Sequence, residues 1–279
     1  MSDAAIILVL LLTAIVHATW NAALKSGADR VLDMAAIRVS GIIFAAVLIP
    51  LTPLPAAEAW PPLLASAVVY MGYYTFLIAS YRHGDLSQVY PIARGSAPLM
   101  AALAAFLFIG ETPTLAGLAG IVAISVGVIA AGTGAFRQNI VAILFAGITG
   151  FTIAANAFLG GIGVRDAGTV LGYSAWLELL TCVPYVAFAV TYRRGHVIAY
   201  ASSRVARRNL ILGFGSVFSF LIALWAMTQL PIATVTAARE TSAVFAALTG
   251  ALLMKEPFAG RRIAAALLVA LGVTLLVIG

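Results

Sequence analysis

Two arginines lie deep inside apolar segments, where a charge is costly. Arg94 and Arg239 each stand about eight residues into a long hydrophobic run, roughly 12 Å deep if the run is helical. A charged side chain at the centre of a bilayer costs about 2.5–3.5 kcal/mol, so it persists where it faces a cavity or a partner. A guanidinium offers a planar fork of donors that suits carboxylate, phosphate and phosphonate groups. The pair predicts a binding site for an anionic group; internal pairing with glutamates is the structural alternative.

Two glutamates and a third arginine lie in similar apolar surroundings. Glu178 and Glu240 are candidate proton carriers, because a proton and a substrate would compete for a neighbouring arginine. The alternative is that they neutralise Arg38 and Arg239. Adjacent residues of a helix point about 100° apart, so a direct bridge between Arg239 and Glu240 is unfavourable. Protons are therefore a candidate coupling ion.

Uncharged polar residues recur at helical spacing near these charges. His17 and Asn21 are four residues apart and share one helix face, with Trp20 beside them. Asn156 occupies a similar place in the second half of the chain. These residues are candidates for lining a substrate cavity, while hydrogen bonding between helices is the alternative for both asparagines and packing is the alternative for His17.

Aromatic and proline residues complete the candidate site. Tyr70 and Tyr74 share a face of the third apolar segment and lie deep enough to line a pocket. Pro91 and Pro98 flank Arg94, and proline removes a backbone hydrogen bond and bends a helix. The two prolines predict either a hinge that gates the cavity or a static bend.

The composition shows which elements must position these residues. Of 279 residues, 63% are hydrophobic and 9% are charged, whereas soluble domains have about 45–50% and about 25%. The net charge of +6 lies in short connections between apolar runs, which indicates membrane topology and not nucleic-acid binding. The sequence predicts an all-α integral membrane protein whose partners are the lipid bilayer and a small-molecule substrate. Each of the ten expected helices can cross a ~30 Å hydrocarbon core; they span 3–24, 33–52, 61–81, 86–109, 114–133, 138–160, 169–192, 209–229, 232–254 and 260–278.

An internal repeat relates the two halves of the chain. Arg94 and Arg239 are 145 residues apart, as are Glu111 and Glu256. The predicted repeats cover residues 1–134 and 135–279, with five helices each. An odd number of helices places the two halves in opposite orientations, and in such inverted repeats the substrate site lies at their interface. Glu111 and Glu256 are expected to cap or pin the fifth and tenth helices.

The basic residues are distributed unevenly between the two sides. Twelve lie on one side, and Arg165 is alone on the other, which also carries both termini. Short loops rich in Lys and Arg remain in the cytoplasm, so both termini are expected outside a bacterial plasma (inner) membrane. The twelve are Lys25, Arg30, Arg82, Arg137, Arg193, Arg194, Arg204, Arg207, Arg208, Lys255, Arg261 and Arg262.

The sequence contains no constellation typical of catalysis. It has no Ser–His nucleophile arrangement, no His or Cys spacing typical of a metal centre and no glycine-rich phosphate loop. Its one cysteine, Cys182, lies in an apolar run and is expected to be a packed residue. We expect a protein without cofactor or metal that is not an enzyme.

Several motifs resemble a known family. They are Trp20-Asn21 with Lys25, Gly110-Glu111-Thr112-Pro113, and the echo Lys255-Glu256-Pro257 in the second half. Together they resemble the drug/metabolite transporter superfamily, EamA type, over the whole chain. The resemblance implies solute transport by alternating access without an ATP site. Many family members are described with cytoplasmic termini, whereas the charge distribution here predicts the reverse.

The expected activity follows from the arginines and this resemblance. It is secondary transport, as an exporter or permease, of a small anionic or zwitterionic metabolite such as an amino acid, an organic acid or a phosphonate-like compound. A flippase for a lipid-linked substrate on the same fold is the alternative.

Overall fold

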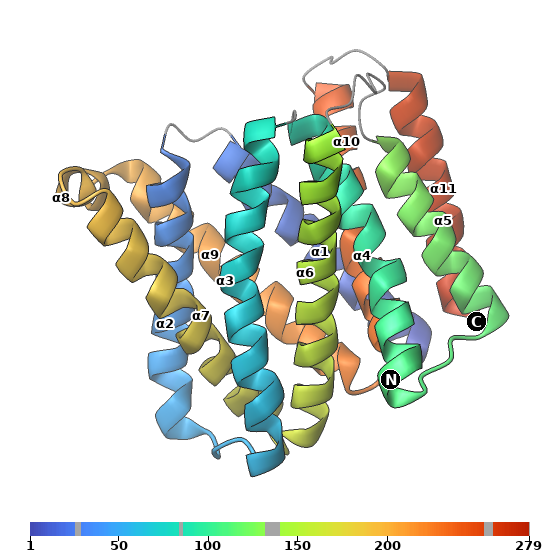
Figure 1. Cartoon of the computed structure of the whole chain (residues 1–279), viewed down its shortest axis with the longest axis horizontal. Coiled ribbons are helices and arrows are strands. Elements are labelled where there is room, and N and C mark those ends of the chain that lie inside the picture. Colours follow the sequence, from blue (N-terminus) through green and yellow to red (C-terminus); the bar gives the residue numbers. More distant parts are fainter. Residues whose placement is uncertain (26–28, 84–85, 132–139, 254–258, 279) are drawn as a thin grey trace.

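The computed structural model describes residues 1–25, 29–83, 86–131, 140–253 and 259–278, and the described part of the chain is built from helices (Figure 1). Ten of these helices are long. They are α1 Asp3–Lys25, α2 Arg30–Leu48, α3 Trp60–His83, α4 Leu86–Ile109, α5 Leu115–Ala131, α6 Ile140–Asp166, α7 Val170–Tyr192, α9 Arg204–Met227, α10 Ile232–Leu253 and α11 Ala259–Ile278.

Three short helical segments lie in the connections. The 3₁₀ turns η1 Ile49–Leu51 and η2 Ala57–Ala59 separate α2 from α3, and the short helix α8 Val197–Ala201 precedes α9. The ten predicted apolar segments correspond to the ten long helices. The two largest differences from the predicted boundaries are at the end of α6, which continues to Asp166 and not to 160, and at the start of α9, which begins at Arg204 and not at 209, within the arginine-rich connection.

Local signals explain where several helices begin and end. Side chains of Asp29, Thr169 and Ser203 accept backbone hydrogen bonds at the first turns of α2, α7 and α9, which satisfies donors that have no partner within the helix. Gly110 and Gly168 follow α4 and α6 with φ angles of 66° and 67°. Glycine adopts this left-handed conformation without steric cost and so ends the helix.

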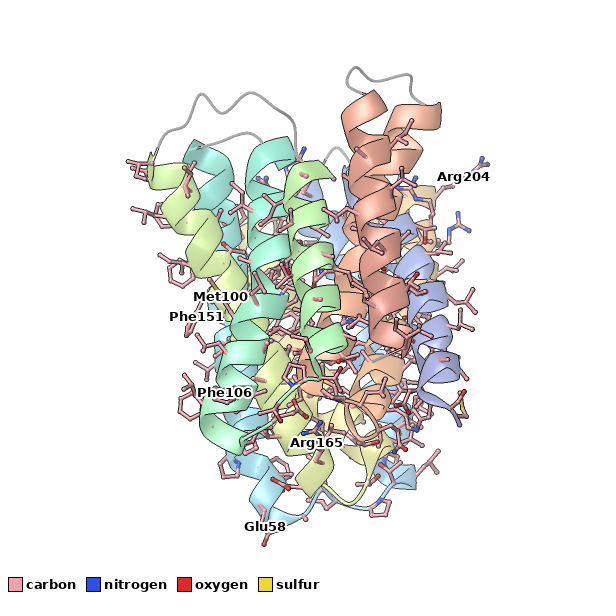
Figure 2. The ribbon with its side chains drawn as sticks, turned by 90° about the vertical axis from the view of Figure 1, so that its right-hand side faces the viewer. Glu58, Met100, Phe106, Phe151, Arg165 and Arg204 are labelled. Atoms are coloured by element: carbon pink, nitrogen blue, oxygen red, sulfur yellow. The ribbon has the colours of Figure 1, made fainter. Side chains whose placement is uncertain are left out.

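The outer surface is apolar over most of its height. Phe106 and Phe151 are 54% and 62% exposed, and Figure 2 shows both side chains pointing outward from the helices. Five segments of the described chain are long and apolar enough to cross a membrane, and shorter apolar helices accompany them. Because such a surface cannot be solvated by water over this area, the protein is a multi-pass membrane protein.

Small residues allow α5 and α11 to approach each other closely. A Cβ atom on Gly120 would lie 2.7 Å from the Gly272 carbonyl oxygen, and one on Gly272 would lie 2.8 Å from the Gly120 oxygen. The backbones therefore touch, as is common where membrane helices pack through small residues.

Both chain termini lie at one end of the molecule (Figure 1). Arg165 lies at this same end, whereas Arg204 lies at the other (Figure 2). The Arg165 side chain pairs with Glu111 at 2.9 Å and donates hydrogen bonds to the carbonyls of Met227 and Leu230. The second Glu111 oxygen accepts from the backbone N–H of Ile232 at 2.9 Å. Glu111 therefore caps α10. It was expected to cap the fifth helix, but its carboxylate instead lies beside the turn that precedes α10.

Candidate functional site

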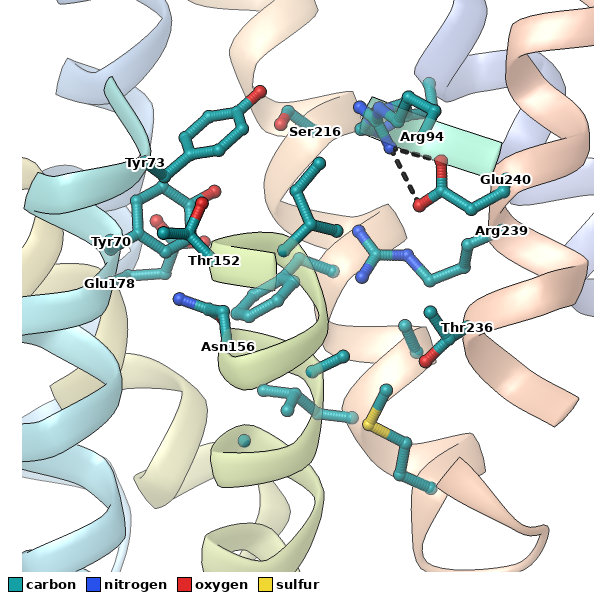
Figure 3. A pocket seen from close by; sticks show the side chains of 18 of the residues that line it. Tyr70, Tyr73, Arg94, Thr152, Asn156, Glu178, Ser216, Thr236, Arg239 and Glu240 are labelled. Atoms are coloured by element: carbon teal, nitrogen blue, oxygen red, sulfur yellow. Dashed lines mark hydrogen bonds and ion pairs between the residues drawn. The ribbon is translucent and has the colours of Figure 1, made fainter. Parts of the chain in front are cut away.

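A cavity lies among the helices in the middle of the molecule, and Figure 3 shows its charged lining. Its free volume is about 90 Å³, enough for several waters at about 10–15 Å³ each. Eight of the predicted site residues line it, and they come from seven helices. They are His17, Arg38, Tyr70, Arg94, Asn156, Glu178, Arg239 and Glu240.

Arg94 of α4 is held by a carboxylate from the other half of the chain. Its Nη1 donates to both oxygens of Glu240 on α10 at 3.0 Å. Its Nη2 lies 3.1 Å from Nε2 of His17 on α1. Because a guanidinium can only donate, this His17 nitrogen accepts and the ring is neutral. Both side chains of the ion pair are nearly inaccessible, at 10% and 4%.

Arg239 has different surroundings although it precedes Glu240 on α10. Its guanidinium carbon lies 5.4 Å from the centre of the Phe220 ring, a distance typical of a cation–π contact. Within the described residues, none of the ion pairs or hydrogen bonds found involves its side chain. Figure 3 shows the guanidinium pointing from α10 into the cavity. The unfavourable Arg239–Glu240 bridge is absent from this part of the chain, as predicted from helix geometry.

The opposite wall is formed by α2, α3 and α7. Nη2 of Arg38 donates to the Tyr70 hydroxyl at 3.4 Å, and its guanidinium carbon lies 5.3 Å from the centre of that ring. Oε2 of Glu178 accepts a hydrogen bond from the Cys182 thiol at 3.0 Å. Cys182 is fully buried, so the packed role predicted for it is confirmed.

Neutral polar groups lie between the two charged walls. Asn156 of α6 lines the cavity and also donates from Nδ2 to the Ser66 carbonyl at 3.3 Å. It therefore meets both interpretations offered for it, cavity lining and a bond between helices. Thr152, Ser216 and Thr236 add hydroxyl groups to the lining.

The charges of the lining do not cancel. Arg38, Arg94 and Arg239 are cationic, whereas Glu178 and Glu240 are anionic. With both carboxylates ionised and the His17 ring neutral, the lining carries one net positive charge. In a site of low dielectric such a charge favours one anionic group.

Some predicted residues lie elsewhere. For Trp20, Asn21 and Tyr74 the structure describes the helical backbone but not the side chains, so their roles stay predictions. Pro91 and Pro98 both lie within the continuous helix α4 and are not part of the cavity lining. Their role in gating also stays a prediction.

The structure adds lining residues that sequence reasoning did not assign to the site. Tyr73 lines the cavity, and its ring meets the Tyr70 ring edge to face at a centroid distance of 5.9 Å. The sequence predicts that Tyr70 and Tyr74 share one helix face and does not single out Tyr73, although a spacing of three residues also brings side chains together on a helix. Phe220 lies under Arg239, and no pattern in the sequence distinguishes it from other apolar residues of α9.

Fold and site together define a helical multi-pass membrane protein with a charged central cavity. In the part of the chain that the structure describes, no group of three or more His, Cys, Asp or Glu residues is placed to hold a metal ion. This combination is typical of proteins that carry solutes through a bilayer.

Comparison with known proteins identifies the family. Residues 4–133 match the model of the EamA-like transporter family, which confirms the resemblance predicted from the motifs and supports the class of membrane transporter or permease. A solved structure described only as "Crystal structure of protein" has the same fold. It superposes with a TM-score of 0.72 at 15% identity, over 98% of this chain and 95% of that one. No curated protein matches the chain.

Proposed function

We propose that this protein is a secondary transporter that moves a small anionic or zwitterionic metabolite by alternating access. The observation that carries the proposal is the unequal state of two cavity arginines. Glu240 holds Arg94, whereas Arg239 points into the cavity without a carboxylate ligand among the described residues. Arg239 is thus the primary ligand for the anionic group of the substrate, such as a carboxylate or phosphonate.

Other lining residues supply secondary contacts in this proposal. Asn156 and the hydroxyl groups of Thr152 and Thr236 offer hydrogen bonds to the polar remainder of the substrate. Tyr70 and Tyr73 offer aromatic edges and hydroxyl groups on the opposite wall. For a zwitterionic substrate, Glu178 on that wall is the candidate partner of the cationic group.

Glu240 provides a physical route to proton coupling. While it is ionised it holds Arg94 through both oxygens. Protonation of Glu240 would weaken this hold and raise the net charge of the lining by one. An anion would then bind more tightly, so a proton and an anion would occupy the protein together and move in the same direction.

Helix packing supports an inverted repeat with boundaries at residues 1–134 and 135–279. In the second half α6 packs on α3 and α4 of the first, while in the first half α1 packs on α9 and α10 of the second. The pairs α2–α7 and α5–α11 also cross between the halves. Exchange of equivalent helices across one axis is expected for such repeats, which enclose a site at their interface.

The orientation of the chain is part of the proposal. Arg165 lies at the end that carries the termini and Arg204 at the opposite, more basic end (Figure 2). We place the basic end in the cytoplasm of a bacterial inner membrane, as the positive-inside rule directs. The Arg165–Glu111 contacts would then close the outer end of the cavity, and would have to separate when the transporter opens outward.

Ligand screening tests the proposed substrate class. The purified protein would be heated with organic acids, phosphonates, amino acids and organic cations, since a ligand of the folded state raises the apparent melting temperature. We expect stabilisation by an anion or zwitterion, loss of that stabilisation in Arg239→Gln, and retention in Arg194→Gln. Arg194 is exposed and outside the cavity, so it controls for charge removal.

Two results would contradict the proposal. Stabilisation by cations or apolar compounds alone, unchanged in Arg239→Gln, would remove Arg239 from recognition. A stabilising ligand that crosses proteoliposome membranes equally fast with and without protein would show binding without transport.

Cysteine labelling tests the orientation. Glu58 lies at the same end of the molecule as Arg165, and Ser202 lies at the opposite end, in the connection before α9. Both residues are exposed, whereas the native Cys182 is fully buried. In intact cells an impermeant maleimide should label Glu58→Cys, and it should label Ser202→Cys only after permeabilisation. The opposite pattern would reverse the proposed topology.

A further inference from the structure

A second concave site lies at the basic end of the molecule, away from the central cavity. It is a hollow lined by Arg204, Arg207 and Arg208 together with Ile211 and Leu212 of α9. The spacings of three and four residues put these side chains on one side of the helix. Three guanidinium groups and an apolar wall therefore meet at one surface site.

The three arginines differ from Arg165 and Arg193 in having no acidic partner among the described residues. Arg165 pairs with Glu111, and Arg193 pairs with Asp29 at 3.1 Å. Within the described residues, none of the ion pairs found involves an arginine of the hollow. Their charges are thus available to an external anion.

Buried polar contacts hold the start of α9 in place behind the hollow. Nδ2 of Asn209 donates to Oδ1 of Asp33 at 2.7 Å, and the Tyr200 hydroxyl donates to the same oxygen at 2.6 Å. Asn209 and Asp33 are nearly inaccessible. The guanidinium of Arg208 in turn lies 3.3 Å from the Asn209 amide oxygen. The arginines are therefore carried on a helix end that is fixed to α2 and α8.

The apolar wall of the hollow continues along α9 toward the middle of the membrane. Ile211 is 70% exposed and Phe218, two turns further, is 53% exposed. Seven residues of helix advance about 10 Å, so these two side chains mark an apolar path of that length on the outer surface. A free phosphate would leave this path unused, whereas a phospholipid would place its headgroup on the arginines and an acyl chain along it.

We propose that this hollow is a binding site for an anionic phospholipid of the adjacent leaflet. The guanidinium groups bind the phosphate by charge-assisted hydrogen bonds, and Ile211 and Phe218 contact one acyl chain. Bound lipid would hold α9, and through Asn209 also α2 and α8, at the membrane boundary. The site is distinct from the cavity and does not depend on the proposed substrate.

Native mass spectrometry of the purified full-length chain tests the site. Phosphatidylglycerol and phosphatidylcholine would be titrated against the wild type, Arg204→Gln/Arg207→Gln and the control Arg30→Gln/Arg194→Gln. Both double variants remove two exposed charges at the same end, but only the first pair lines the hollow. A guanidinium that bonds the phosphate directly contributes about tenfold or more to its affinity, whereas a basic residue that only lies near the membrane surface contributes about fivefold or less. We therefore expect on the order of 100-fold weaker phosphatidylglycerol binding in the first variant and a clearly smaller loss, at most about 25-fold, in the control.

Three results would overturn the proposal. Equal losses in both double variants would indicate a general surface charge effect. Equal binding of phosphatidylcholine and phosphatidylglycerol by the wild type would remove the role of the negative charge. Competition by free glycerol phosphate at the concentration of the lipid would show a site for soluble anions. The charge-conserving variant Arg204→Lys/Arg207→Lys controls for misfolding of the glutamine variant. It should keep most of the phosphatidylglycerol binding, because it keeps both positive charges.

Discussion

Arg94 and Arg239 stand at equivalent positions of the two halves, 145 residues apart, yet the two guanidinium groups meet different partners. The arginine of the first half is enclosed by Glu240 and His17. The arginine of the second half rests on Phe220 and reaches into the cavity. Of these two arginines, one is therefore neutralised by a carboxylate, and the other has no carboxylate ligand among the described residues.

The neighbouring residue accounts for the difference. The position that follows Arg239 holds Glu240, whereas the position that follows Arg94 holds Gly95. A Cβ atom on Gly95 would lie 2.5 Å from Cγ1 of Ile129 and 2.8 Å from the Ser125 carbonyl oxygen. Packing of α4 against α5 therefore excludes a carboxylate at position 95 of the first half. The equivalent carboxylate of the second half, Glu240, pairs with the arginine of the first half.

The sharpest test of this comparison is removal of the shared carboxylate. Glu240→Gln leaves Arg94 buried without its ion pair, and breaking a buried pair costs about 3–5 kcal/mol. The apparent melting temperature in detergent should fall accordingly. The double variant Arg94→Gln/Glu240→Gln should recover most of the loss, because no uncompensated charge remains. Equal losses in the single and double variants would show that the pair does not stabilise the fold.

The same variant tests proton coupling through ligand affinity. Removal of the Glu240 charge leaves the lining with one more positive charge, so Glu240→Gln should bind an anionic substrate more tightly than the wild type does, measured by calorimetry on the folded fraction. Unchanged affinity would assign coupling to another group, with Glu178 the next candidate.

Removal of the other arginine should affect binding and leave stability largely intact. Charge-assisted hydrogen bonds contribute about 1.5–3 kcal/mol, so Arg239→Gln should weaken substrate binding on the order of 10- to 100-fold. Its melting temperature should stay near that of the wild type, because Arg239 has no carboxylate ligand among the described residues. Arg239→Lys should be intermediate, since it keeps the charge and loses the planar fork. A large loss of stability with unchanged binding would exchange the roles of Arg239 and Arg94.

A second contact between the halves serves as a comparison outside the cavity. Arg165 of the second half pairs with Glu111 of the first and also bonds two carbonyls. The pair is partly exposed, so Arg165→Gln should cost about 1–2 kcal/mol. Equilibrium substrate affinity should change less than in Arg239→Gln, while exchange of bound substrate should become faster as the outer end opens. Slower exchange would argue against a closing role for this contact.

The smallest effect is expected at a third contact between the halves, where Tyr200 meets Asp33 at the basic end. Burial, followed by this hydrogen bond, raises the pKa of the Tyr200 phenol above its ordinary value. A raised folded-state pKa contributes stability that is present below the unfolded value of about 10 and is lost as the pH rises above it. Thermal scans should therefore show less alkaline destabilisation in Tyr200→Phe than in the wild type, and parallel curves would contradict this assignment.

Much of the fold could be predicted because the bilayer leaves few choices. A chain in lipid must satisfy its backbone hydrogen bonds internally, so each long apolar run becomes a helix. For this reason the ten predicted segments correspond to the ten long helices. The predicted end of α6 and the predicted start of α9 are several residues from those observed. The turn at Gly168 and the cap at Ser203 set these two ends, and hydropathy does not detect such local signals.

The set of cavity residues was also accessible from the sequence, because a polar side chain in an apolar run needs a polar environment. Arg94, Arg239, Glu178 and Glu240 are predicted on this ground, and all four line the cavity. Phe220 is not, because its apolar side chain needs no such environment and it matters only because Arg239 lies over its ring.

The sequence by itself determined that charges lie within apolar helical segments, and it predicted that two of them are related by a repeat. Only the tertiary structure decided which charges neutralise each other. Arg94 and Glu240 are 146 residues apart, and their pairing arises because α4 and α10 pack together. An ion pair depends on a separation of a few ångströms between side-chain atoms, and helix packing sets that distance while spacing along the chain does not.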